Sequence, residues 1–492
     1  MSSPHTIEQF NVENPPNIYT KRGSGFSSDS DNTEEEDDNT NDNIIFQKDS
    51  VDIRKNSKVK KGICGIRSDS EFTCILNIIV SAIGGGCFHF PFMMYEGGIM
   101  VILFVFLFVT GCTYYIIDLL RSFVVDTKYF SFALMTETIL GSKWLKIYSF
   151  CSFVIYVSMV INYLTSIYVY FQGMLEYDNN LINILYFVIT IILEIFICLS
   201  LRKMKNLNYL ALVSFTSFCI ITISLIIISI MANAHGGVTD KFNLDNLYFP
   251  KIAPKSFTNK LLKISSYIME YVYGYQYHST FPTVIGNLHT VNNTTTQKVH
   301  LISFGVIVLT YMIVTFFGFI LSTTVPNTIF QENDKYFNGL WGADLRKPFK
   351  IVLIIYLLTL VPIRFIVIRD NYITLIGKKR INILSELSII IIFVVICNIF
   401  VFGVGTFEKY FGNWDIRTLI QAFGGMFGVI ISFSLPVVNY ISVNGKKKIK
   451  SIIGYAITLF FVIIAFFSTS YTFYKIAIGN DKNNSENIEQ NQ

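Results

Sequence analysis

Long apolar segments alternate with short polar loops along most of the chain from Phe72 onward. A helix needs about 20 apolar residues to cross a hydrocarbon layer about 30 Å thick. Eleven segments reach this length, and none shows the alternating pattern of barrel strands. They span residues 72–94, 97–120, 144–171, 181–201, 207–232, 259–285, 299–323, 349–371, 383–404, 414–442 and 451–478. The pattern predicts an all-α polytopic membrane protein with eleven transmembrane helices.

Composition supports this class and excludes others. The chain of 492 residues is 52% hydrophobic and only 15% charged, which is too apolar for an ordinary soluble enzyme. Its 8 cysteines fall in the amino-terminal region or in apolar segments and form neither a disulfide framework nor a metal-binding motif. The net charge of +5 is modest, and nothing indicates nucleic-acid binding. We therefore expect no metal, no cofactor and a lipid bilayer as the surroundings.

The two ends of the chain differ from the apolar region between them. Residues 1–70 are polar and contain an acidic run at Glu34–Asp38, so we expect a disordered cytosolic tail. We expect no cleavable signal peptide there, because no apolar core of that kind precedes residue 70. The transmembrane domain is expected at 71–480, followed by a short outer or luminal tail at 481–492. The positive-inside rule places the amino terminus in the cytosol. The basic residues behind that orientation follow segments four, eight and ten, and are Arg202, Lys203, Lys205, Lys378, Lys379, Arg380, Lys446, Lys447, Lys448 and Lys450.

Two apolar segments are interrupted at matching places. The first contains Gly84-Gly85-Gly86 followed by Pro91, and the sixth contains Gly274 followed by Pro282. Glycine costs roughly 1 kcal/mol and proline about 3 kcal/mol inside a helix, so both helices are expected to break. Broken backbone in a membrane is tolerated where it faces protein, water or a ligand. The breaks are therefore the candidate binding site, although a single glycine can also serve close helix packing.

The broken segments begin two blocks of five segments, residues 72–232 and 259–442, with an extra segment at 451–478. One block begins inside and the other outside, and such a pair of interrupted helices is typical of a transporter site at a repeat interface. A half-helix that begins at a break offers N–H groups to a carboxylate, and one that ends there offers carbonyl groups to an ammonium group or a cation. A zwitterionic amino acid matches both.

The motifs at the breaks resemble those of the amino acid/auxin permease family, amino acid transporters of the APC superfamily. The run from Ser81 to Phe92 resembles the family's first-span motif, and Tyr273 to Pro282 resembles its sixth-span motif. Weaker matches follow at 359–370 and 424–436. The resemblance implies a leucine-transporter-type fold with 5+5 inverted repeats plus one helix. It also implies secondary-active transport of amino acids by alternating access, coupled to H⁺ or Na⁺ and not to ATP.

The candidate site residues follow from the breaks and the resemblance. The expected substrate-binding residues are Ser81, Gly84, Gly85, Gly86, Cys87, Tyr273, Gly274, Tyr275 and His278, and the candidates for ion coupling are Glu270, Thr359, Asn77 and His89. Val80 stands where sodium-coupled relatives usually have Asn, whereas Thr359 matches a hydroxyl position that they use. Acids and histidines inside the membrane suit H⁺, and Glu194 adds another. We favour H⁺ over Na⁺.

Other interpretations remain open. Many rings and a single acid near the breaks favour neutral or aromatic substrates. An amino-acid sensor that signals through the amino-terminal tail is one alternative, and an intramembrane acyltransferase-like enzyme with His278 as a base is another. Arg364 and Arg369 are expected to anchor their span at the cytosolic face. We expect no enzyme activity, a monomer, and either the plasma membrane or a vacuolar or lysosomal membrane.

Overall fold

The computed structural model describes residues 70–175, 180–200, 207–234, 257–321, 343–377, 383–411, 424–445 and 449–489. All of them belong to one compact unit, Val59–Gln492. Within these ranges every regular element is a helix. The predicted tail at 1–70 lies outside the described residues, apart from Ser70.

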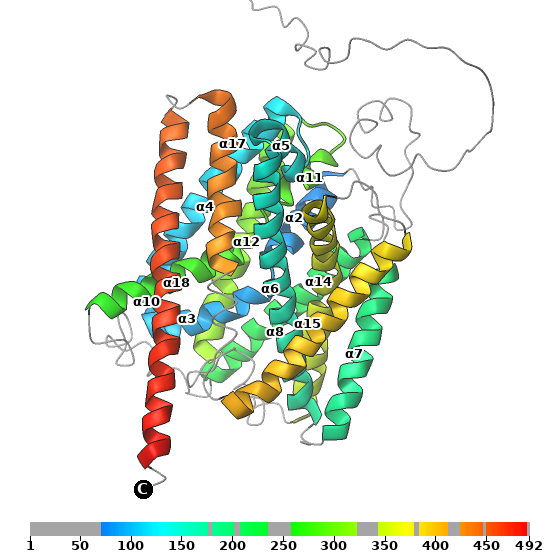
Figure 1. Cartoon of the computed structure of the whole chain (residues 1–492), viewed down its shortest axis with the longest axis vertical. Coiled ribbons are helices and arrows are strands. Elements are labelled where there is room, and N and C mark those ends of the chain that lie inside the picture. The colour runs from blue at the N-terminus through cyan, green and yellow to red at the C-terminus, as the bar shows by residue number, and fades with distance from the viewer. Residues whose placement is uncertain are drawn as a thin grey trace, which may run out of the picture. The chain divides into compact units, whose positions relative to one another are not determined.

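The helices follow the predicted segments closely (Figure 1). The first half of the chain forms α2 (Glu71–Ala82), η2 (Gly85–His89), α3 (Phe90–Gly97), α4 (Ile99–Thr127), α5 (Phe132–Leu140), α6 (Ser142–Leu175), α7 (Asn180–Ser200) and α8 (Leu207–Ala234). The second half forms α10 (Phe257–Gly274), α11 (Phe281–Gly286), α12 (Asn293–Leu321), α14 (Ala343–Ile376), α15 (Ile383–Phe411), η5 (Ile430–Ser434), α17 (Leu435–Asn444) and α18 (Ile449–Glu489).

Seven helices of the described residues are long and apolar enough to cross a membrane, and the bent pair formed by α2 with η2 and α3 makes an eighth candidate. The seven are Ile99–Thr127, Ser142–Tyr168, Tyr209–Ile230, Asn293–Ile320, Pro348–Ile376, Gly424–Asn444 and Ile449–Phe473. Large apolar side chains such as Phe104, Leu309 and Phe466 are exposed on them, as lipid-facing side chains are. The chain is thus a multi-pass membrane protein whose described residues form helices. Eleven spans and the 5+5 repeat stay predictions.

The packing places the first break at the centre of the helices. α6 and α14 pack against each other, and α2 contacts α8 and α12. α7 packs against α15, and the long α18 packs against α10 and α17 (Figure 1). η2 contacts α6, α10 and α12. The segment after the first break is therefore enclosed by helices from both halves of the chain.

Both predicted breaks are present. α2 starts where the Ser70 hydroxyl oxygen accepts a hydrogen bond from the Thr73 N–H, and its last backbone bond runs from Ile83 N–H to Ile79 O. The chain then bends by 53° between Glu71–Ala82 and Cys87–Tyr95. In the sixth segment α10 ends at Gly274, and α11 resumes with Pro282 in its first turn, where the missing N–H costs nothing.

Several helices extend beyond their predicted segments, as α4 and α18 do, and one short helix lies between two predicted segments. The short α5 lies between two predicted segments and was not predicted, because its nine residues are too few to cross a membrane. Ser131 caps it by accepting a hydrogen bond from the Leu134 N–H. α4 continues beyond residue 120 through Arg121 and ends at Thr127, before Lys128 in a left-handed conformation with φ 59°. Hydropathy identifies only the apolar part of a helix, so the predicted end falls short where the last turns are polar.

Candidate functional site

Three side chains cap the carbonyl end of α2. The Arg364 Nη2 group donates to Ser81 O at 2.8 Å, and the Tyr356 hydroxyl donates to Ile83 O at 3.0 Å. Between them the Tyr311 hydroxyl lies 2.8 Å from Ala82 O. A helix that stops leaves its last carbonyl groups without backbone donors, and buried carbonyls need partners. Residues from α12 and α14 supply these partners.

The same tyrosine joins the two breaks. The Tyr311 hydroxyl also lies 2.7 Å from Gly274 O, the carbonyl at the end of α10, so its one hydrogen is shared between the two helix ends. Its ring is fully buried and packs edge-on against Phe90 at 5.2 Å between centroids. Phe90 in turn packs against Tyr271 at 4.4 Å. One side chain therefore fixes the distance between the two interrupted helices.

Arg364 does not anchor its span at the membrane face, so that expectation is wrong. The side chain is 1% exposed and reaches inward from the middle of α14 to the end of α2. Its guanidinium carbon lies 5.5 Å from the centroid of the Tyr156 ring on α6. The Tyr156 hydroxyl hydrogen-bonds Ser279 Oγ at 2.7 Å, within the second break. Arg364 and Tyr156 therefore form a second link between the two breaks. Arg369, in contrast, pairs with the neighbouring Asp370 and lies nearer the surface.

Close approaches explain why glycine is needed at two break positions. A Cβ atom on Gly84 would collide with the Tyr163 hydroxyl of α6, and one on Gly274 would lie 2.6 Å from Phe90 Cζ. Real Cβ atoms essentially never approach a neighbour so closely, so a larger residue at either position would have to displace the Tyr163 or Phe90 side chain. Gly84 thus lets α6 come against the first break, and Gly274 lets α3 come against the second.

The remaining residues of the predicted first-break set lie together. Gly85, Gly86 and Cys87 are in η2, and Cys87 Sγ donates to Gly84 O at 3.1 Å. The Ser81 hydroxyl donates to Ile78 O of its own helix at 2.9 Å. The structure therefore gathers Ser81 to Cys87 with Gly274 around the side chains of Arg364, Tyr311 and Tyr356.

Three predicted residues of the second break contact other neighbours. Tyr275 shares a hydrogen bond with Thr110 of α4 at 2.8 Å and stacks near Phe304 of α12. Tyr273 is buried where Gly424 passes, since a Cβ on Gly424 would lie 2.7 Å from its Cε2. The buried His278 ring lies 5.9 Å from Phe433 of η5. These contacts give the three side chains packing partners beyond the first break.

The candidates for ion coupling lie at separate places. The Thr359 hydroxyl donates to Tyr356 O of its own helix at 2.6 Å. Asn77 is half-buried on α2, Glu270 is half-buried one turn before Gly274, and His89 is buried at the end of η2.

A narrow crevice between α2, α8 and α14 is lined by Ile79, Val80, Ile83, Ser214, Phe215, Phe218 and Tyr356. Six of these seven residues are hydrophobic or aromatic, which is a poor environment for a bare cation.

A buried acid lies away from the breaks. Glu194 of α7 is 1% exposed, and its Oε2 accepts a hydrogen bond from Asn398 Nδ2 of α15 at 2.8 Å. This pair joins two helices that pack against each other at the side of the molecule (Figure 1). Its first role is therefore to hold α7 and α15 together.

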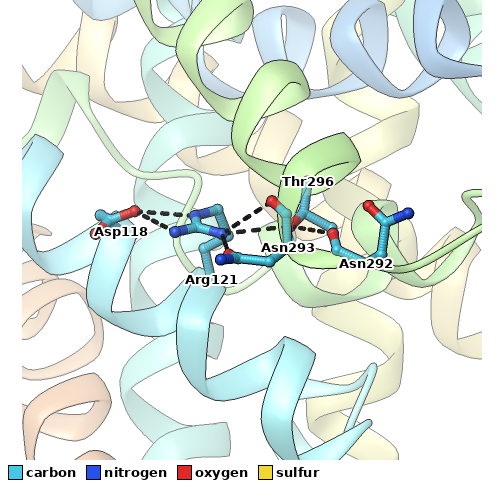
Figure 2. A network of polar contacts seen from close by, with 5 residues as sticks. All are labelled: Asp118, Arg121, Asn292, Asn293 and Thr296. Atoms are coloured by element: carbon cyan, nitrogen blue, oxygen red, sulfur yellow. Dashed lines mark hydrogen bonds and ion pairs between the residues drawn. The ribbon is translucent and has the colours of Figure 1, made fainter.

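A polar network fastens α4 to the start of α12 (Figure 2). Arg121 pairs with Asp118 at 2.8 Å, one turn back on α4, and also donates to the Asn293 side chain. Asn293 and Asn292 offer backbone oxygens to the Thr296 hydroxyl at 3.1 and 2.8 Å. Figure 2 shows Arg121 between Asp118 and Asn293. The loop after α11 is thereby tied to α4.

The side chains that hold the site together were not among the predicted site residues; they are Arg364, Tyr311, Tyr356, Tyr156 and Tyr163. Arg364 carried a usable signal, because an ionisable residue within an apolar span is functional by default. The tyrosines carried none, since tyrosine is frequent throughout this chain, at 28 residues.

Two broken helices joined at the centre of an apolar helical assembly are typical of membrane transporters. The chain matches the family model described as transmembrane amino acid transporter protein over residues 67–478, and it belongs to that family. No curated protein matches the sequence. The family predicted from the motifs at the breaks is thus confirmed.

Solved structures of transporters share the fold. The chain resembles the Eremococcus coleocola manganese transporter in complex with an aromatic bis-isothiourea substituted compound, with 10% identity and a TM-score of 0.54, covering 82% of this chain and 87% of that one. Two mutants of that transporter match with TM-scores of 0.56 and 0.55, at 10% and 8% identity and the same coverage. At such low identity the likeness concerns the fold alone.

Proposed function

We propose that the protein is a secondary-active amino acid transporter that works by alternating access, with its substrate bound where the two broken helices meet. The observation that carries this proposal is the Tyr311 hydroxyl shared between Ala82 O and Gly274 O, because it couples the two helix ends that would move against each other. Membership of the amino acid transporter family supports the substrate class. The structural neighbours are named for manganese, and their likeness gives no reason to transfer that substrate.

Neutral or aromatic amino acids suit the surroundings of the breaks. Phe90, Tyr271 and Tyr311 form a continuous group of rings, with centroids 4.4 and 5.2 Å apart. Aromatic pairs of this kind contribute about 0.5–1.5 kcal/mol each beyond simple burial, and they favour apolar partners. The carbonyl end of α2 already has protein donors, so a substrate ammonium group would have to displace one of them or bind elsewhere.

H⁺ is the coupling ion that this arrangement favours over Na⁺. A sodium ion needs several oxygen ligands, and Arg364, Tyr311 and Tyr356 occupy three consecutive carbonyls at the end of α2. The guanidinium also places a positive charge beside Ser81 O, which repels a second cation at short range. Glu270, half-buried one turn before the second break, is the acid we propose as the proton carrier.

The sensor and enzyme alternatives make different predictions. A sensor would bind an amino acid without net uptake and would signal through the amino-terminal tail. Deletion of residues 1–65 would therefore abolish the signalling of a sensor, whereas it would leave the uptake of a transporter intact. An enzyme would use His278, whose ring packs with Phe433 and Tyr277. The family and the structural neighbours are transporters, which supports the first function.

Uptake by the purified chain in proteoliposomes tests the proposal. We expect labelled neutral or aromatic amino acids to accumulate under an imposed pH gradient and not under a Na⁺ gradient alone. Gly86→Leu and Gly274→Leu should each reduce uptake strongly, because both positions lie at a break. The control is Gly111→Leu, where a Cβ would meet nothing within 4 Å. Intact uptake in both break variants would contradict the site, and uptake driven by Na⁺ alone would contradict the coupling ion.

A further inference from the structure

Arg364 is a buried cation with incomplete pairing. Its side chain is 1% exposed, and Nη2 donates to Ser81 O at 2.8 Å. The other two nitrogens, Nε and Nη1, have no hydrogen-bond partner among the described residues. The ion pairs found within the same ranges do not include Arg364. A guanidinium that is buried without full pairing is costly, and this cost calls for an anionic partner.

The protein supplies only part of that compensation. The carbonyl end of α2 carries the negative end of the helix dipole, equivalent to roughly half an elementary charge. The face of the Tyr156 ring, 5.5 Å from the guanidinium carbon, adds a cation–π contact. Tyr163 and Tyr356 also interact with the guanidinium. None of these groups carries a full negative charge, and Nε and Nη1 still have no hydrogen-bond partner among the described residues.

The position of Arg364 is also the position where the breaks meet. It contacts the first break directly through Ser81 O and the second through Tyr156, whose hydroxyl bonds Ser279 Oγ at 2.7 Å. A substrate held between the breaks would therefore lie within reach of an arginine that lacks a counter-charge.

We propose that Arg364 determines the charge selectivity of the transporter, because its unpaired nitrogens bind a carboxylate of the substrate and its charge excludes cationic amino acids. This inference rests on the proposed transport function and names the substrate class within it. Arginine matches carboxylate geometry with two parallel hydrogen bonds, which lysine cannot reproduce. The carboxylate belongs either to the backbone of a neutral amino acid or to the side chain of an acidic one.

Competition for uptake tests the inference. Wild-type proteoliposomes take up the labelled amino acid that they transport best, while unlabelled neutral, acidic and cationic amino acids and neutral amino acid amides compete. We expect neutral or acidic amino acids to compete at least about ten-fold more strongly than lysine, arginine or the amides. Competition by acidic but not neutral amino acids identifies the side-chain carboxylate, and competition by neutral amino acids identifies the backbone carboxylate.

Variants at the same helix complete the test. Arg364→Gln should raise the half-saturating substrate concentration about ten-fold or more and weaken the discrimination against lysine, whereas Arg364→Lys should keep that discrimination. Arg369→Gln is the matched control, because it makes the same change on α14 at a residue paired with Asp370. Unchanged selectivity in a folded Arg364→Gln would overturn the inference. If that variant aggregates in size-exclusion chromatography, equal competition by cationic and neutral amino acids in the wild type overturns it instead. Wild-type protein that transports no amino acid would refute the proposed function itself.

Discussion

Replacing Tyr311 by phenylalanine removes the one hydroxyl that joins the two breaks. The substitution keeps the ring, so the packing against Phe90 at 5.2 Å and Tyr275 at 5.1 Å is retained. It leaves Ala82 O and Gly274 O buried without this donor. An unsatisfied buried polar group costs about 1–3 kcal/mol, and a loss of about 1.4 kcal/mol is a ten-fold change in an equilibrium.

We therefore expect Tyr311→Phe to unfold a few degrees below the wild type and to take up substrate at least several-fold more slowly. Thermal unfolding of the detergent-purified protein and uptake in proteoliposomes measure the two effects. Tyr277→Phe is the matched control, because Tyr277 is also fully buried and its hydroxyl has no hydrogen-bond partner among the described residues. If Tyr311→Phe were as stable and as active as the control, the hydroxyl would not couple the breaks.

Three further changes test other parts of the structure. Gly84→Ala should lower stability and uptake because its Cβ meets the Tyr163 hydroxyl, and adding Tyr163→Phe should recover part of both; a double variant no better than the single one would refute the collision. Glu270→Gln should reduce uptake driven by a pH gradient, whereas Glu194→Gln, which keeps an oxygen for its amide partner, should not; equal effects on uptake would count against Glu270 as the proton carrier. Arg121→Gln should destabilise the protein by about 1–3 kcal/mol in thermal unfolding because it breaks a buried network, and an unchanged melting temperature would contradict this (Figure 2).

The sequence allowed the breaks to be predicted because their causes are local. Three glycines ahead of Pro91 stop α2 within two residues of the expected place, and Gly274 with Pro282 does the same for α10. Glycine and proline disfavour a helix wherever they stand, so no knowledge of the tertiary structure was needed. The lengths of most apolar helices were also predictable, because each helix must cross a hydrocarbon layer of about the same thickness.

The partners of the broken ends were not predictable. Ser81 and Arg364 are 283 positions apart, and Ala82 and Tyr311 are 229 apart, so no spacing along the chain relates them. They meet because α12 and α14 pack beside α2. From the sequence, the carbonyl groups at the end of α2 were expected to be available to an ammonium group or a cation. In the structure they accept hydrogen bonds from protein side chains that tertiary packing brings to them. The helix α5 was not predictable for a different reason, because hydropathy does not distinguish a helix of nine residues from a loop.

The most direct test of the account is uptake of a panel of labelled amino acids into proteoliposomes that contain the full chain, under imposed pH and Na⁺ gradients. We expect at least one neutral or aromatic amino acid to accumulate under the pH gradient, and we expect Gly274→Leu to abolish this accumulation while Gly111→Leu does not. No accumulation of any amino acid by the folded protein under either gradient would contradict it.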